Sequence, residues 1–326
     1  MAHWRTTTLA ASDRKASTQE LYSNLSRRHL EPGPFGAIRL DKLKPSNVEA
    51  LLLEMRAKTK PGIPTEVEPN PEPVRALADS TIRQIYTVLR AGLDGAVRDG
   101  LLAKNPAAMI RRPGVARTEA RHVSAADVTK LLLCAESLRY RDALILIAAT
   151  GMRRGEAAAL RWCNVDLDAG LLVVRGTLNR VAGRLVITEP KTDRSRRPVP
   201  VPPPLVAVLQ AHRAEQETER MMARDQWRDH DLVFATKLGT PVDPSNILRT
   251  IQIAAQKAGI ADVGVHTLRH SAAVAWLESG VHIKAVADLL GHSSIAITGD
   301  VYGHTSDSTA RAAVGGLADQ LGLPNL

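Results

Sequence analysis

The chain contains the sequence Thr-Gly-Met-Arg-Arg-Gly-Glu at residues 150–156, and Ala-Leu-Arg-Trp-Cys-Asn-Val-Asp-Leu follows shortly after it. An apolar segment at about residues 139–149 precedes this stretch and predicts a buried helix. Gly151 allows a turn at the end of that helix, and Arg153 comes directly after the turn. Taken alone, an arginine after a glycine turn is typical of a solvated surface. Whether Arg153 has a function can therefore be judged only with the other motifs of the chain.

Three further polar segments follow in the same half of the sequence. Glu-Pro-Lys-Thr-Asp-Arg-Ser-Arg-Arg (189–197) places Lys191 in a turn between two predicted strands. His-Thr-Leu-Arg-His (266–270) places two histidines and an arginine close together. Leu-Leu-Gly-His-Ser-Ser-Ile-Ala-Ile-Thr-Gly-Asp-Val-Tyr-Gly-His (289–304) brings a histidine after a helix-ending glycine and then a tyrosine. Each segment would be ordinary alone, but the four together form a constellation.

The order of these segments resembles the tyrosine recombinase, or phage integrase, family. Members of that family carry T-G-x-R-x-G-E, then a lysine in a β-turn, H-x-x-R, L-G-H and a tyrosine. The match spans residues 122–304, and the helical region before it resembles the core-binding domain of the family. Arg154 falls on the variable position of the first motif and is left out. The resemblance assigns the catalytic roles to six residues: Arg153, Lys191, His266, Arg269, His292 and Tyr302.

The resemblance implies a transesterification on DNA. The hydroxyl of Tyr302 would attack a phosphodiester, form a 3′-phosphotyrosine and release a 5′-hydroxyl, which needs neither ATP nor a metal nor another cofactor. Negative charge gathers on the non-bridging oxygens in the transition state, and the guanidiniums of Arg153 and Arg269 suit that charge. Lys191 on its turn would protonate the leaving 5′-oxygen as the general acid.

The roles of the two histidines stay open at this point. A tyrosine hydroxyl, with a reference pKa of about 10, needs a base that accepts its proton. We assign His266 to that proton transfer and His292 to hydrogen bonding of the phosphate, but the sequence does not separate the two roles. His266 and His270 could instead be two metal ligands on one helix, yet no third ligand stands at a supporting spacing. We interpret three other polar residues of these motifs as structural: His270, Glu156 and Asp166.

The chain is expected to be mainly α-helical with a small antiparallel β-sheet. A helical ladder of apolar residues over 80–97 predicts core packing in a first, four-helix domain. Segments 171–178, 184–188 and 197–201 predict a three-stranded antiparallel sheet in a second, α+β domain. The predicted divisions are a flexible N-terminus (1–16), a core-binding domain (17–110) with a flexible insertion near 58–75, a linker (111–121), a catalytic domain (122–306) and a C-terminal tail (307–326).

The charge of the chain predicts a polyanionic partner. Its 326 residues contain 43 Lys and Arg against 34 Asp and Glu, which gives a net charge of +9. The excess is concentrated before residue 117, where 18 basic residues face 12 acidic ones. Aromatic residues make up only 3%, which argues against a protein that stacks single-stranded bases on aromatic rings. Double-stranded DNA is therefore the predicted partner.

Other features concern the compartment. The longest apolar run, residues 143–151, is well short of the roughly 18 residues of a membrane span, and the first residues show no secretory signal. Cys134 and Cys163 each stand in an apolar pattern, which suits packed, reduced thiols better than a disulfide. We expect a cytoplasmic, nucleoid-associated protein of a bacterial cell or a phage-infected host, with no membrane partner.

The resemblance implies a site-specific recombinase, and phage or prophage integration and excision is the expected process. The first core-binding helix begins near residue 17, which leaves no room for an arm-binding domain before it, so core-type attachment sites are the expected targets. The active form would be a homotetramer on paired DNA, with a possible accessory protein that sets direction. The tail would contact a neighbouring protomer or fold on its own domain.

Alternatives within the class are a chromosome-dimer resolvase and a transposon-borne recombinase. Two others use the same fold differently. A DNA-binding regulator would have lost the chemistry, but its expected signature, a substituted Arg, Lys or Tyr, is not seen. A relaxing topoisomerase would share the chemistry without needing a tetramer. Assays of strand exchange and of supercoil relaxation distinguish a recombinase, a DNA-binding regulator and a relaxing topoisomerase.

Overall fold

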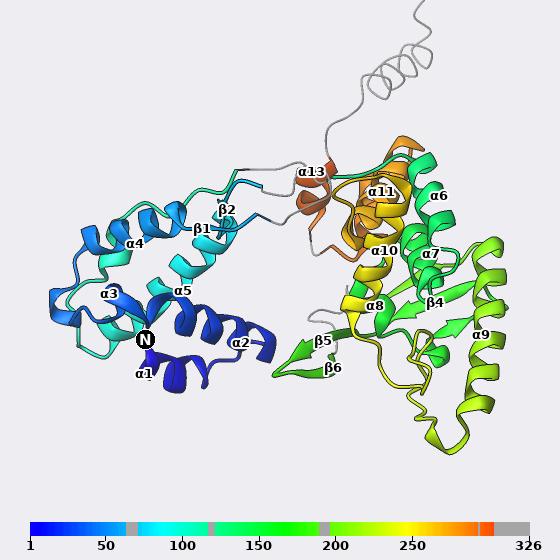
Figure 1. Ribbon diagram of the computed structural model, residues 1–326, viewed down its shortest axis with the longest axis horizontal. Coiled ribbons are helices and arrows are strands. Elements are labelled where there is room, and N and C mark those ends of the chain that lie inside the picture. Colours follow the sequence, from blue (N-terminus) through cyan, green and yellow to red (C-terminus); the bar gives the residue numbers. More distant parts are fainter. Residues whose placement is uncertain (63–70, 117–120, 189–195, 293, 303–326) are drawn as a thin grey trace, which may run out of the picture. The chain divides into compact units, whose positions relative to one another are not determined.

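The computed structural model describes residues 1–62, 71–116, 121–188, 196–292 and 294–302 (Figure 1). The chain divides into two compact units, Met1–Thr118 (unit 1) and Glu119–Leu326 (unit 2). Most of the described residues lie in helices, and the strands form small antiparallel sheets. The predicted fold class is therefore confirmed. None of the described helices is long and apolar enough to cross a bilayer.

Unit 1 is built around α5 (Asp79–Arg98), whose apolar residues recur every three or four positions. Ile82, Ile85 and Leu89 are at most 2% exposed, so the predicted core ladder is confirmed. The helices around it are α1 (Ala2–Trp4), α2 (Ala16–Leu25), α3 (Gly33–Gly36), α4 (Pro45–Ala57), the π-helical turns η1 (Arg5–Leu9) and η2 (Ser26–Leu30), and the 3-10 turns η3 (Leu40–Lys42) and η4 (Pro106–Met109).

The prediction of a flexible N-terminus over 1–16 needs correction. Trp4 and Leu9 are buried in the core of unit 1, 6% and 2% exposed. Two glycines of α5 make room for the N-terminal segment, because a Cβ on Gly95 would lie 3.1 Å from Trp4 Cδ1 and one on Gly92 would lie 2.6 Å from Met1 Sδ. Glycines inside a helix usually weaken it, and here they open a groove that takes up an aromatic ring.

The proline-rich segment 58–75 also differs in part from the prediction. Its two ends pair as short antiparallel strands, β1 (Thr59–Lys60) with β2 (Val74–Arg75). Residues 63–70 lie outside the described part of the chain. The prediction of a flexible insertion over 58–75 is therefore wrong at the two ends of that segment, which form paired strands.

Unit 2 places a bundle of helices against a small sheet. Its core gathers apolar side chains from several of the helices and from the inner face of the sheet. Its helices are α6 (Ala125–Cys134), α7 (Arg141–Thr150), α8 (Arg154–Ala158), α9 (Pro203–Ala223), α10 (Pro244–Ala258), α11 (Val265–Glu278), α12 (Ile283–Leu290) and α13 (Ile295–Tyr302), with 3-10 turns η5 (Trp162–Asn164) and η7 (Arg224–Gln226).

The β-structure of unit 2 differs from the single sheet that we expected. A three-stranded antiparallel sheet has the order β3 (Val165–Asp166), β4 (Leu171–Val174), β7 (Arg197–Pro200). A separate hairpin joins β5 (Thr177–Val181) to β6 (Arg184–Thr188). The segment 171–178 was wrongly predicted as one strand, because the chain leaves the sheet at residues 175–176. Ala182 and Gly183 both have positive φ, which suits a two-residue hairpin turn.

Strand β7 has a register that matters for the site. Arg197 pairs with Val174 and Val199 pairs with Leu172, and all four side chains face inward and are at most 4% exposed. Successive side chains of a strand alternate between its faces, so Pro198 and Pro200 are exposed. A buried arginine therefore begins the last strand of the sheet.

The two cysteines are free, and they differ in exposure. Cys134 is half-buried at the end of α6, as the apolar pattern predicts. Cys163 is exposed in the 3-10 turn after α8, so the prediction of a packed thiol is wrong there. Its backbone amide donates to Asp231.

Candidate active site

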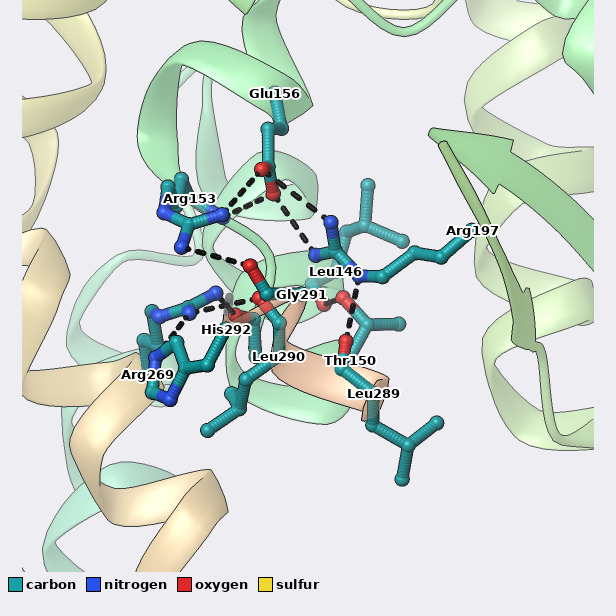
Figure 2. Close-up of polar contacts among 11 residues, drawn as sticks. Leu146, Thr150, Arg153, Glu156, Arg197, Arg269, Leu289, Leu290, Gly291 and His292 are labelled. Carbon is teal, nitrogen blue, oxygen red and sulfur yellow. Dashed lines mark hydrogen bonds and ion pairs between the residues drawn. The ribbon is translucent and has the colours of Figure 1, made fainter. Parts of the chain in front are cut away.

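Three of the six predicted site residues, Arg153, Arg269 and His292, meet at the C-terminal end of α12 (Figure 2). Gly291 follows the helix with φ +64°, the left-handed conformation that ends many helices. The last carbonyls of a helix have no partner within it and carry partial negative charge. Three successive carbonyls here each accept a hydrogen bond from a different arginine: Leu289 O from Arg197 Nε at 2.6 Å, Leu290 O from Arg269 Nη2 at 2.8 Å, and Gly291 O from Arg153 Nη2 at 3.2 Å.

Arg269 is the most buried of the predicted residues whose side chains the structure describes. It belongs to α11 and is only 3% exposed. Besides the bond to Leu290 O, its Nη1 donates to the carbonyl of Gly151 at 2.6 Å. Gly151 ends α7 in the left-handed conformation, so one guanidinium holds together the ends of α7 and α12.

Arg153 stands at the start of α8 and reaches toward the surface. Its side chain is 38% exposed. Its Nη1 donates to Glu156 Oε1 at 2.8 Å, and its backbone amide donates to Glu156 Oε2 at 2.9 Å. The second contact is the return bond of a helix N-terminus, in which the third helical residue caps the chain before the helix. The motif of residues 150–156 thereby fixes the guanidinium through its own last residue.

Glu156 is a buried carboxylate between two arginines, and its side chain is 7% exposed. On its other side, Arg197 donates from Nη2 to Oε2 at 2.9 Å and from Nη1 to Oε1 at 3.3 Å. Burial alone would raise the pKa of Glu156, but the hydrogen bonds and charge of Arg197, followed by the charge of Arg153, lower it. The carboxylate is therefore ionised at neutral pH.

His292 connects the arginine cluster to α13. Its Nε2 lies 2.9 Å from Arg269 Nη2, and its Nδ1 lies 2.8 Å from Thr298 Oγ1. A guanidinium only donates, so Nε2 accepts and the ring is neutral, with its proton on Nδ1 and directed at Thr298. Burial, then the charges of Arg269, Arg153 and Arg197, lower the pKa of His292 to about 4, in agreement with that tautomer. Thr298 is fully buried.

His266 occupies the first turn of α11 and is exposed. Its ring centroid lies 6.4 Å from that of His270. Partial loss of hydration, followed by the charges of Arg269, Arg154 and Arg153, lowers its pKa. A neutral histidine at the surface beside these guanidiniums has the protonation state that a proton acceptor requires.

The two remaining predicted residues are described less fully. Lys191 falls between β6 and β7, in residues 189–195, which lie outside the described part of the chain. Tyr302 is the last residue of α13, one helical turn after Thr298, and only its backbone is described. The helix that carries the predicted nucleophile is thus joined to His292 through Thr298.

Sequence reasoning missed two residues of this site and gave a third only a general structural role. Arg197 was counted only as the start of a strand, although the alternation of Arg197 with Val199 is a signal that both face inward. Thr298 was not singled out, and no local pattern marks it. Glu156 was interpreted as structural, and its contacts show that it is the common partner of Arg153 and Arg197.

His270 is half-buried, and partial burial followed by the charge of His266 lowers its pKa to about 4.

The described residues hold no group of three or more His, Cys, Asp or Glu side chains placed to bind a metal ion. The groups that converge at the end of α12 are the guanidiniums of three arginines, the neutral imidazole of His292 and the carboxylate of Glu156, with a net positive charge. Such a set can hold an anion with a tetrahedral oxygen arrangement and can take up a proton beside it. The site therefore suits phosphoryl chemistry by charge and by protonation state.

The neutral state of His292 predicts a pH dependence of stability. In the unfolded chain this histidine binds a proton below about pH 6.5, whereas the folded protein keeps it neutral down to about pH 4. The unfolded state then binds more protons in this window, so stability falls as the pH falls from 6.5 to 4. We expect denaturant titrations to give a free energy of unfolding that declines more steeply for the wild type than for His292→Gln, by up to about 1.4 kcal/mol per pH unit. Parallel curves for the two proteins would contradict a neutral, half-buried His292.

The comparisons with known proteins agree with the geometry. Residues 121–309 match the model of the phage integrase family. A XerC-like tyrosine recombinase of Caldanaerobacter subterraneus is 32% identical over 263 residues, 74% of this chain and 66% of that protein. The integrase of Mycobacterium phage L5 is 28% identical over 291 residues, 88% of this chain and 70% of that protein.

Solved structures share the fold over nearly the whole chain. The Tn1549 transposon integrase, solved with a circular intermediate DNA, is similar with a TM-score of 0.76 and 19% identity, over 96% of this chain and 98% of that one. Lambda integrase, solved as a tetramer on a Holliday junction, is similar with a TM-score of 0.65 and 18% identity, over 94% of this chain and 78% of that one. By the family match, the relatives and the shared fold, the chain belongs to the phage integrase family of tyrosine recombinases, which are site-specific DNA recombinases.

Proposed function

We propose that the chain recombines DNA at specific sites for the integration and excision of a phage or prophage. It would cleave one strand through Tyr302, hold the DNA as a 3′-phosphotyrosine and rejoin it to another strand. The observation that carries this proposal is the cluster at the end of α12, where Arg153, Arg269 and His292 come together from three separate segments of unit 2. The similarity to a phage integrase supports the choice of process.

Each residue has a proposed role in the transfer. Arg153 and Arg269 hold the non-bridging oxygens of the phosphate, where charge grows in the transition state. Arg153 is the more exposed of the two, and its Nη2 bond to Gly291 O is the longest of the three carbonyl contacts, so it is the one that can turn toward DNA at least cost. Lys191 protonates the leaving 5′-oxygen.

The histidines divide the remaining tasks. His266, exposed and neutral, accepts the proton of the Tyr302 hydroxyl. His292 bonds to the phosphate from Nε2 only after Arg269 Nη2 releases that atom and the ring proton moves, because Nε2 accepts from Arg269 in the free protein. No step requires ATP or a metal, since one phosphodiester is exchanged for another.

The wider organisation is part of the same proposal. Residues 17–110, together with the N-terminal segment 1–16 that packs in the same core, act as the core-binding domain, residues 122–306 as the catalytic domain, and residues 111–121 as the linker between them. Four copies act on two paired core-type sites, as a tetramer structure of a family member supports, and the tail 307–326 contacts a neighbouring copy. An accessory protein sets direction, and the work is done at the nucleoid in the cytoplasm.

A pair of assays tests this function against its two rivals. DNA segments that co-purify with the protein are sequenced and made as two labelled duplexes, and the same segment is cloned into a supercoiled plasmid. We expect products that join one duplex to the other, in chelator and without ATP. Relaxation of plasmids that lack the segment, without joined products, would identify a topoisomerase. Binding of the duplexes with neither joining nor relaxation would identify a DNA-binding regulator.

A further inference from the structure

We propose that Arg197 is a positioning residue of the site: it holds Glu156 and the turn after α12 in the arrangement that places Arg153, and it does not itself touch DNA. The inference rests on the proposed recombination. It concerns a residue outside the six that the family motif assigns, at the first position of β7.

The burial of the three side chains follows a gradient. Arg197 and Glu156 are 5% and 7% exposed, whereas Arg153 is 38% exposed. The charge of Arg197 is paired with the buried carboxylate of Glu156, which Arg153 also contacts, so we assign Arg197 to that carboxylate and not to a phosphate. Its influence on the reaction has to pass through Glu156 or through the backbone.

The first route is through the charge of Glu156. If Arg153 turns toward a phosphate, its bond to Glu156 Oε1 lengthens, and a buried carboxylate without a counter-ion is costly. Arg197 stays beside both carboxylate oxygens and supplies that counter-ion permanently. Glu156 then keeps its second bond, to the backbone amide of Arg153, and fixes the start of α8 while the guanidinium moves.

The second route is through the backbone after α12. Arg197 Nε donates to Leu289 O at 2.6 Å, and its guanidinium packs against Gly291 so closely that a Cβ there would lie 2.8 Å from Nη1 and 3.1 Å from Cζ. Gly291 O is the acceptor for Arg153, and His292 comes next in the chain. Arg197 thus fills the space between the carboxylate and the turn (Figure 2).

A lysine would not do the same work. Arg197 uses three nitrogens for acceptors on two sides, the carboxylate and the Leu289 carbonyl. A lysine ammonium is a single point that can face one of them. Arg197→Lys keeps the positive charge but loses the forked arrangement of donors. Arg197→Met keeps much of the side-chain length but loses both the charge and the donors.

The test uses a charge-neutral substrate. Strand cleavage is timed in single turnovers on two nicked duplexes, one with the ordinary scissile phosphodiester and one with a methylphosphonate there. In Arg197→Met, Glu156 and the turn after α12 would no longer hold Arg153 in position. Cleavage of the phosphodiester should then slow about 100-fold, the usual effect of one lost transition-state donor. The neutral methylphosphonate gathers less negative charge, so the same variant should be slowed less than about 10-fold on it.

Three controls accompany these rates. Affinity for the duplex in native gels should stay within about threefold, because Arg197 does not touch DNA. Arg139→Met is the matched control: it removes another arginine paired through both nitrogens with a glutamate, Glu219, in unit 2, and should leave both cleavage rates unchanged. If Arg197→Met does not fold by thermal melting, Arg197→Lys is used, and it should be slowed at least about 10-fold on the phosphodiester and less on the methylphosphonate.

The outcomes distinguish the inference from the function on which it rests. Wild-type protein that binds the duplex and never cleaves it overturns the proposed recombination, and this inference with it. Wild-type cleavage with an undiminished Arg197 variant overturns the inference alone. An equal slowing on both substrates also overturns it, because a merely structural loss would not depend on the charge of the phosphate.

Discussion

Tyr302→Phe is expected to abolish covalent attachment to DNA and to leave DNA affinity nearly unchanged. The substitution removes the nucleophilic hydroxyl and keeps the ring, so side-chain packing and DNA affinity should barely change. The readout is a duplex nicked close to the cleavage position. After attack the short fragment diffuses away, no 5′-hydroxyl remains for rejoining, and the adduct accumulates as a slower band on a denaturing gel.

Tyr140→Phe is the matched control for this prediction. Tyr140 lies in the same unit, directly before α7, and its change to Phe should leave the band intact. Native gels should show that Tyr302→Phe still binds the duplex within about twofold of the wild type. A band that persists in Tyr302→Phe and disappears in Tyr140→Phe would transfer the role of nucleophile to Tyr140.

Lys191→Ala is expected to slow cleavage of ordinary DNA by about 100-fold to 10,000-fold, the range for a lost general acid. The leaving 5′-oxygen then departs without a proton. Replacing that bridging oxygen with sulfur should restore most of the rate, because a thiolate leaves without protonation. Single-turnover cleavage of matched oxygen and sulfur duplexes measures both effects.

Arg153→Lys separates the acid from the charge stabilisation. Arg153 is assigned to the non-bridging oxygens, so its variant should be slow on the oxygen and on the sulfur duplex alike. Rescue that occurs for Lys191→Ala and not for Arg153→Lys supports the assignment of the acid. A Lys191→Ala protein that stays equally slow on sulfur would remove Lys191 from that role.

The parts of the fold that the sequence predicts well are those with strong local periodicity. The apolar ladder in α5 and the apolar run of α7 each bury one face of a helix, and the spacing of the apolar residues alone predicts both helices. The cap of α6 is a local signal of the same kind, because the Ser124 hydroxyl accepts from the amide of Asp127, three residues later in the chain. Such signals need no knowledge of distant segments.

The parts that escaped prediction depend on contacts between distant segments. Trp4 is buried because two glycines some 90 residues later open a groove for it, and no local pattern around Trp4 reports them. The run 171–178 looks like one strand, but its second half pairs with β6 instead of β7. Sequence alternation does not say which partner a strand takes.

The site shows the same division. Its motif residues could be named because their order along the chain resembles a family, but the order does not say what holds them. Arg197 and Glu156 form an ion pair across 41 residues, and His292 bonds to Arg269 across 23. The shared feature is the carbonyl end of α12, which three guanidiniums cap. A helix C-terminus attracts cations in general, but which cations arrive there is set by tertiary packing.

The proposed mechanism is tested most sharply by identifying the residue that becomes joined to DNA. Wild-type protein is incubated with the nicked duplex in the presence of chelator, the adduct is digested with protease, and the peptide that carries the nucleotide is mapped by mass spectrometry. The proposed mechanism requires a single linkage, from the Tyr302 oxygen to a 3′-phosphate, with a free 5′-hydroxyl on the released fragment. A linkage at another residue, a linkage to a 5′-phosphate, or bound DNA with no adduct at all would contradict it.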